Sequence, residues 1–155
     1  MHPKFAAHVE SLDVSLKSLL AMRPVKVDQL PSAIPPAGVY LISEGKAHLY
    51  VGRSNNLRRR IRRHGRPGAG HRVAAFAFRL ARAATGLLKA SYKTKGSRAD
   101  LMTDPKFLAA FTSAKERIRR MDIRFVGESD PTRQALLEIY IAVVLGTPHN
   151  DFDTH

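Results

Sequence analysis

The segment between residues 38 and 64 limits the folds open to this chain more than any other part of its 155 residues. Its sequence, GVYLISEGKAHLYVGRSNNLRRRIRRH, places two short apolar runs of strand type on either side of a glycine-containing turn. This pattern predicts a β-hairpin over residues 38–44 and 47–53. A helix rich in arginine follows, with Ser54 or Asn55 as its candidate N-cap.

The register of this hairpin decides where its two tyrosines point. If Ser43 pairs with Ala47, Tyr40 lies opposite Tyr50 and both hydroxyls share one face of the sheet. If the turn comprises only two residues, a shift of one position sends the tyrosines to opposite faces. The turn sequence alone leaves both registers open.

The remaining elements are mostly helical. Apolar residues at helical spacing predict a helix between residues 5 and 19, a short one from residue 73, and a longer one opened by Asp104-Pro105. Residues 121–126 alternate as a third strand. A last helix begins at Ser129-Asp130-Pro131 and ends near Gly146. Because that helix is apolar nearly all round, we expect it to be central to the core.

The charge of the chain is unusual for a globular protein. Lysine and arginine number 26 against 13 acidic residues, for a formal net charge of +13. Such a field attracts polyanions, among which nucleic acid is the usual partner. The absence of cysteine excludes disulfides and thiolate zinc sites and fits a cytoplasmic protein. No apolar run approaches the length of about 18 residues that crosses a membrane, so no membrane partner is expected.

The arginine helix sorts its charges into two sets. On a helical wheel, Leu57 and Ile61 form the buried stripe, while Arg60 and His64 lie at its edge, one turn apart. The other arginines face solvent and suit contact with a phosphate backbone. The residues expected to contact nucleic acid are Arg53, Arg58, Arg59, Arg62, Arg63, Arg66, Lys93, Lys95 and Arg98.

Glu138 is the only acidic residue of the last helix. An ionised carboxylate on a buried helix is costly unless it meets a cation or a metal. One interpretation is an ion pair with Arg133 or Arg60. The other is a site for one Mg²⁺, an ion that tends to take one or two protein ligands and to keep several waters. The residues alone leave both open.

These features together resemble a known family. Gly38-Val39-Tyr40 and Tyr50-Val51-Gly52 resemble the two halves of the GIY-YIG nuclease signature, separated as in that family. Arg60, ten residues after the second tyrosine, Glu138 on a late helix and Asn150 near the end match further family positions. His64 and Arg53 match residues that some members carry.

The resemblance implies an α+β fold, in which a small three-stranded antiparallel sheet is flanked by helices and both tyrosines share one face. Here an extra N-terminal helix and a proline-marked connector, residues 1–36, precede the nuclease-like domain of residues 37–155. The implied activity is endonucleolytic hydrolysis of DNA phosphodiester bonds with one Mg²⁺ or Mn²⁺. DNA is the expected partner and RNA stays open, as do a homodimer and a separate specificity subunit.

The resemblance also implies a role for each site residue. Glu138 would hold the metal, and Arg60 would bind the phosphate oxygens. Tyr40, in preference to Tyr50, would position or deprotonate the attacking water. A tyrosine pKa near 10 is too high for an efficient base, so nearby cations would have to lower it. His64 would share that proton, and Asn150 would order the site by hydrogen bonds.

The alternative is a non-catalytic nucleic-acid-binding module that uses the arginine helix. It explains the positive charge equally well. It does not explain why Tyr40, Tyr50, Arg60, Glu138 and Asn150 should all be present in one chain, so we expect a nuclease.

Overall fold

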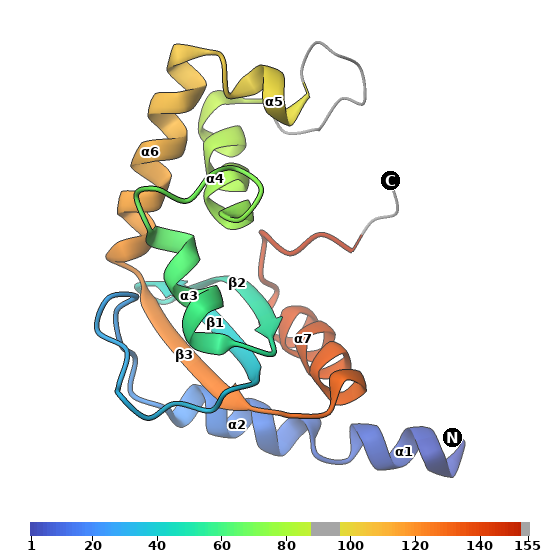
Figure 1. The fold of residues 1–155 in the computed structure, drawn as a ribbon. Helices are drawn as coiled ribbons and strands as arrows, with labels where there is room; N and C mark the ends of the chain where they lie inside the picture. The colour runs from blue at the N-terminus through green and yellow to red at the C-terminus, as the bar shows by residue number, and fades with distance from the viewer. Residues whose placement is uncertain (88–96, 153–155) are drawn as a thin grey trace. The chain divides into compact units, whose positions relative to one another are not determined.

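The computed structural model describes residues 1–87 and 97–152, which form parts of two compact units (Figure 1). The first unit combines Met1–Ile61 with Met121–His155, and the second is Arg62–Arg120. The first contains α1 Pro3–Val9, α2 Leu12–Ala21, β1 Gly38–Glu44, β2 Ala47–Ser54, β3 Asp122–Gly127 and α7 Pro131–Leu145. The second contains α4 Ala75–Thr85, α5 Arg98–Leu101 and α6 Pro105–Arg119. Helix α3, Leu57–Gly65, begins in the first unit and ends in the second.

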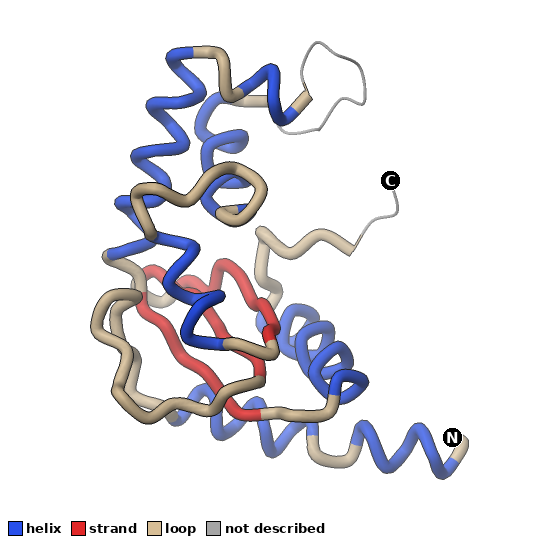
Figure 2. Tube along the Cα trace, viewed as in Figure 1, coloured by secondary structure: helices blue, strands red, loops and turns tan. Residues whose placement is uncertain are grey.

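The strands form one antiparallel sheet in the order β2-β1-β3 (Figure 2). Strand β1 is central and is buried over its first six residues, because it has a neighbour on each side. A small three-stranded antiparallel sheet with flanking helices is the fold that the sequence predicts, so the predicted α+β class is confirmed.

The hairpin differs in detail from both predicted registers. Its turn has two residues, since Glu44 pairs with Ala47, but the register shifts between Ile42 and Ser43. This β-bulge leaves Leu49 as an extra residue in β2. The extra residue adds a second one-position shift to the one that the short turn imposes, so Tyr40 pairs two positions beyond Tyr50.

The bulge therefore decides where the tyrosines point. Tyr40 pairs with Gly52, and Ile42 pairs with Tyr50. Paired residues and residues two apart on a strand share a face, so both tyrosines lie on one face. The expected shared face is confirmed, whereas the expected pairing of Tyr40 with Tyr50 is wrong.

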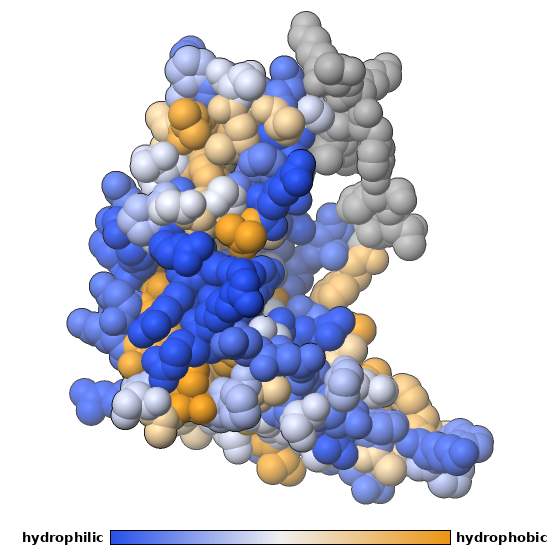
Figure 3. All heavy atoms as spheres, viewed as in Figure 1, coloured by the Kyte–Doolittle hydropathy of each residue, from blue (hydrophilic) through white to orange (hydrophobic). Residues whose placement is uncertain are grey.

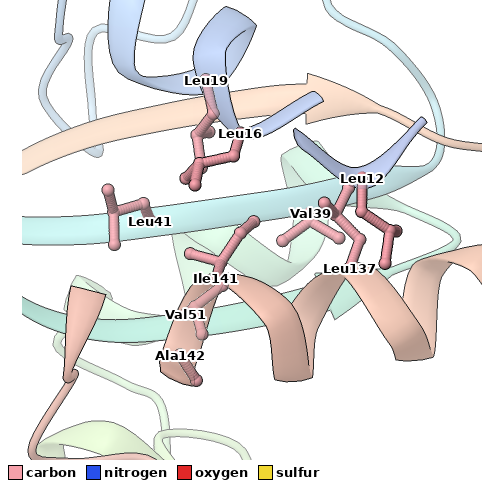
Figure 4. Close-up of a cluster of buried hydrophobic side chains, with 9 residues drawn as sticks. All are labelled: Leu12, Leu16, Leu19, Val39, Leu41, Val51, Leu137, Ile141 and Ala142. Carbon is pink, nitrogen blue, oxygen red and sulfur yellow. The ribbon is translucent and has the colours of Figure 1, made fainter. Parts of the chain in front are cut away.

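Helices α2 and α7 cover the face of the sheet opposite the tyrosines. Their apolar side chains meet those of β1 and β2 in a single cluster (Figure 4). This burial of apolar area is the main force that holds the first unit together. The cluster comprises Leu12, Leu16, Leu19, Val39, Leu41, Val51, Leu137, Ile141 and Ala142.

One expectation about these helices is wrong, and the expected central place of α7 in the core holds for only one of its faces, which carries Leu137 and Ile141. The helix predicted between residues 5 and 19 is two helices with a break at Glu10 and Ser11, and Phe5 stays 47% exposed. Helix α7 is not enclosed on all sides, because Val143 is 71% exposed and Ile139 is also on the surface. Helix α7 is therefore less buried than its apolar composition predicts.

The second unit is built around phenylalanines of α4 and α6. The ring centroid of Phe78 lies 5.0 Å from that of Phe107 and 6.3 Å from that of Phe111. Asp104 caps α6 by accepting a hydrogen bond from the backbone nitrogen of Lys106 at 3.0 Å, as its sequence predicts. Leu108 of α6 is 45% exposed.

No helix in residues 1–87 and 97–152 is long and apolar enough to span a bilayer. The predicted boundary at residue 37 stays a prediction. The N-terminal helix α2 contributes to the same apolar cluster as the sheet, so it is part of the first unit.

Candidate active site

The two signature tyrosines lie close together on the sheet, with ring centroids 6.4 Å apart. Tyr40, on the central strand, is 0% exposed, whereas Tyr50, on the edge strand, is half-buried. The phenol of Tyr40 lies directly against Gly52, where an added Cβ would overlap its hydroxyl and ring. Glycine is therefore required at position 52 for the tyrosine to lie this close to β2.

Helix α3 brings an arginine to these tyrosines. Its cap is Asn56, whose Oδ1 accepts a hydrogen bond from the backbone nitrogen of Arg59 at 3.1 Å, so the predicted caps Ser54 and Asn55 are wrong by one or two positions. Leu57 and Ile61 are fully buried, as predicted, and this anchors the first turns of the helix.

The Arg60 guanidinium donates hydrogen bonds to the hydroxyls of both Tyr40 and Tyr50. Burial alone would lower the pKa of Arg60, but its interactions with the two tyrosines raise it overall. Arg60 therefore stays a cation, fixed in orientation by two hydroxyl oxygens that accept its hydrogen bonds. A cation held in this way, ahead of any ligand, can bind a phosphate oxygen without first reorganising.

The environment of Tyr40 does not favour its ionised form. Burial raises the pKa of Tyr40 well above its usual range, and Tyr50 adds to the rise, while Arg60 only partly opposes it. The expectation that nearby cations lower this pKa is therefore wrong, because complete burial penalises a phenolate more than one guanidinium stabilises it. Tyr40 is suited to hydrogen bonding as a neutral phenol.

Glu138 on α7 pairs with Arg53 at the end of β2. The Arg53 Nε donates to the Glu138 Oε2 at 3.0 Å, and the carboxylate side chain is 21% exposed. Arg133, one of the two expected partners, instead donates from Nε to Glu128 at 3.1 Å. Burial raises the pKa of Glu138, and the charges of Arg53 and Arg60 oppose this without cancelling it.

The donor set at Glu138 fits a single hard cation. Within residues 1–87 and 97–152, no three His, Asp or Glu side chains gather as a metal site, so at most one further side chain of these types would join Glu138 as a ligand. Mg²⁺ accepts one carboxylate if waters and a phosphate complete its shell. The raised pKa means that burial destabilises the ionised carboxylate more than Arg53 and Arg60 stabilise it. A bound divalent cation would stabilise the ionised form further.

Asn150 lies at the free edge of β2. Its Oδ1 accepts a hydrogen bond from the backbone nitrogen of Val51 at 2.9 Å, and its Nδ2 donates to the Val51 carbonyl at 2.7 Å. Thr147 Oγ1 also donates to the same Oδ1 at 2.7 Å. The side-chain amide thus pairs with the strand as a neighbouring strand would, and it fixes the backbone between Tyr50 and Gly52.

His64 lies in the second unit, buried beside Phe76 with ring centroids 6.2 Å apart in an edge-to-face arrangement. Its proposed share in the proton transfer stays a prediction.

The basic residues expected to contact nucleic acid, apart from Arg53, lie in different surroundings. Arg59, Arg62 and Arg66 are exposed and Arg63 is half-buried, and a dense hydrophilic surface lies over α3 (Figure 3). Arg58, expected to face solvent freely, donates to the carbonyls of Pro31 and Ser32 and so ties down the connector. Arg98 is exposed and lies over the ring of Phe78, whereas Lys93 and Lys95 lie outside the described residues.

Sequence reasoning missed Arg53 as the partner of Glu138. The signal was present, because alternation along β2 places Arg53 on the same face as Val51. That is the face covered by α7, which carries Glu138. The contact of Gly52 with Tyr40 was also missed, since it depends on the bulge.

Comparison with known families agrees with this geometry. Residues 36–94 match the family model described as the GIY-YIG catalytic domain. No curated protein and no solved structure matches the chain. Domains of this family are typically endonucleases that generally use a divalent metal. The match over residues 36–94, together with the fold and the site geometry, supports a relationship of this segment to the GIY-YIG nuclease family.

Proposed function

We propose that this protein is a divalent-metal-dependent endonuclease that hydrolyses the phosphodiester bonds of DNA. The observation that carries the proposal is the hydrogen bonding of Arg60 to both Tyr40 and Tyr50. Arg60 and Tyr40 also lie within electrostatic reach of Glu138, which is partly desolvated. A binding module would need the positive surface but not this convergence of an arginine, two phenols and a carboxylate.

Arg60 is placed to stabilise charge on the scissile phosphate. In hydrolysis a bond forms between the water oxygen and phosphorus, the bond to the leaving oxygen breaks, and negative charge accumulates on the non-bridging oxygens. A guanidinium already oriented by two phenols meets that charge without reorganising. Loss of one such donor commonly costs about 10²–10³-fold in rate.

The two tyrosines have different surroundings and therefore different roles. Tyr50 is half-buried and can reach solvent, so its hydroxyl is the one that positions the attacking water. Tyr40 is fully buried with a raised pKa, and it serves as a neutral phenol that holds Arg60. This division reverses the preference for Tyr40 as the group that acts on water.

Glu138 would hold the metal ion, with Arg53 beside it. A bound Mg²⁺ or Mn²⁺ would supply positive charge to the phosphate and the leaving oxygen. Arg53 occupies one carboxylate oxygen in this structure, so the second oxygen is the one open to a cation. Arg53 also keeps the partly buried carboxylate ionised by lowering its pKa against the effect of burial.

The test compares wild-type protein with Glu138→Ala on supercoiled plasmid, single strands, forks and flaps, each with Mg²⁺, Mn²⁺ or EDTA. Glu116→Ala is the matched control, because it removes an exposed carboxylate from α6, outside the site. We expect metal-dependent cleavage by wild type and Glu116→Ala and none by Glu138→Ala. Tyr50→Phe should lose more activity than Tyr40→Phe.

Two results would contradict the proposal. Cleavage that persists in Glu138→Ala or in EDTA would mean that this carboxylate and a metal are not needed. Equal DNA binding by all variants, with no cleavage of any substrate, would favour the non-catalytic binding module.

A further inference from the structure

We propose that the second unit carries its own phosphate-binding site, formed by Arg82 and Arg98 over the ring of Phe78 with Arg79 within electrostatic reach, which holds the backbone of a nucleic acid. This site is separate from the tyrosine and glutamate cluster of the first unit. The choice of nucleic acid as its ligand rests on the proposed function, whereas the site itself rests on the following contacts.

The aromatic ring of Phe78 is the fixed platform of the site. It is almost completely buried and packs against Phe107 and Phe111 of α6. The Arg98 guanidinium carbon lies 4.6 Å from its ring centroid, and that of Arg82 lies 5.8 Å away. Stacking on an aromatic face restricts a guanidinium while leaving its N–H groups able to donate.

Arg82 has a donor without a partner. Its Nε donates to the carbonyl of Leu87 at 2.7 Å, which fixes the guanidinium. Its Nη2 is buried and makes no hydrogen bond within the described part of the chain. A buried donor left unsatisfied is costly, about 1–3 kcal/mol in proteins generally, and an anion oxygen would satisfy it.

The charges that converge here are of one sign. Burial lowers the pKa of Arg82, and the charges of Arg98 and Arg79 lower it further. The pKa of Arg98 is lowered by burial and by Arg79. His71, whose ring centroid lies 6.1 Å from that of Phe78, has its pKa lowered by burial, Arg98 and Arg72. A phosphate would relieve this mutual repulsion.

The surrounding sequence favours a polyanion over a small phosphate compound. Residues 62–120 hold 15 lysines and arginines against three acidic residues. A field this extended favours a ligand whose charge is repeated along its length. Arg98 and Arg72 are exposed, so such a ligand could reach the cluster from solvent.

The test measures binding of a short labelled DNA duplex to the full chain carrying Glu138→Gln, in EDTA, over a range of salt concentrations. Arg79→Gln, Arg82→Gln and Arg98→Gln are compared singly with Arg23→Gln, which removes an exposed arginine of the first unit. Each lost phosphate contact should reduce the salt slope by about 0.9 and weaken binding about fivefold near physiological salt. Arg23→Gln should change neither quantity.

Arg98→Lys separates loss of charge from loss of folding, because it keeps the cation and should restore most of the salt slope. Unchanged slopes in all three glutamine variants would overturn the proposal. Cluster-dependent binding to phosphatidylserine vesicles with unaltered DNA binding would also overturn it, in favour of a membrane surface. Because the assay reads binding without cleavage, its result does not depend on the outcome of the Glu138→Ala experiment.

Discussion

At the scale of single residues, a hydrogen atom in place of Cβ decides how closely Tyr40 can lie against β2. A side chain at position 52 would overlap the Tyr40 hydroxyl and ring, and the tyrosine is completely enclosed. We therefore expect Gly52→Ala to lower the free energy of unfolding by about 1–3 kcal/mol, a common cost of overpacking. The change should also displace the phenol from Arg60 and reduce cleavage.

Urea denaturation and plasmid cleavage would measure the two effects. Gly68→Ala is the matched control, because a Cβ there meets no atom within 4 Å and its backbone needs no positive φ. If Gly52→Ala were as stable and as active as Gly68→Ala, the close approach of Tyr40 to β2 would have no consequence.

Glu138 provides a prediction about pH. Burial raises the pKa of this carboxyl above its ordinary value of 4.5, so the folded state binds the proton more tightly than the unfolded state. Stability should therefore fall as pH rises from 4.5 through the higher folded value. Glu138→Gln removes this loss of stability because the amide does not ionise. Its oxygen can still accept a hydrogen bond from Arg53.

We expect Glu138→Gln to be more stable than wild type near neutral pH and equally stable well below pH 4.5. Chemical denaturation at several pH values would measure the difference, with Glu116→Gln as the exposed control. A less stable Glu138→Gln near neutral pH would show that the Arg53 ion pair outweighs the effect of burial.

At the scale of elements, the free edge of β2 is held by the side chain of Asn150 and by the backbone nitrogen of His149, which donates to the Leu49 carbonyl at 3.1 Å. Asn150 both accepts from and donates to the backbone of Val51. Asn150→Ala removes both bonds, and at about 0.5–1.5 kcal/mol each they predict a loss of about 1–3 kcal/mol. Hydrogen exchange should rise at Val51 more than at β1, whose pairing with β3 is unaffected. Uniform exchange across the sheet would contradict this local role.

The same edge shows which parts of the fold could be predicted. The two strands of the hairpin follow from their apolar runs, and the starts of α6 and α7 follow from the Asp-Pro pairs that cap them. The bulge at Leu49 could not be predicted, because an extra residue in a strand leaves no mark on its composition. The family resemblance gave the correct shared face although the assumed pairing was wrong.

The candidate site could be predicted by residue type but not by partner. Tyr40 lies within electrostatic reach of Tyr50, Arg60 and Glu138. The direction of the Tyr40 pKa was missed, because it depends on complete burial. The sequence pattern indicates which face of the sheet a strand residue lies on, but not what fraction of its ring is exposed to solvent.

At the scale of the whole molecule, the chain builds two cores from interrupted segments. It leaves the sheet unit after Ile61, forms the helical unit, and returns at Met121 to add β3 and α7. The sheet unit depends on the cluster that contains Leu16, whereas the helical unit depends on phenylalanines such as Phe107. Each core has its own side chains, so damage to one should remain within its unit.

Leu16→Ala and Phe107→Ala test this separation. Both side chains are buried, and each truncation should cost about 2–5 kcal/mol. Leu16→Ala should raise hydrogen exchange in β1, β3 and α7 and abolish DNA cleavage, because that core supports the strands that carry the tyrosines. Phe107→Ala should raise exchange in α4 and α6 while β1 stays protected. If both variants raised exchange equally throughout the chain, the two units would unfold as one cooperative body, and the second phosphate site would share its stability with the tyrosine site.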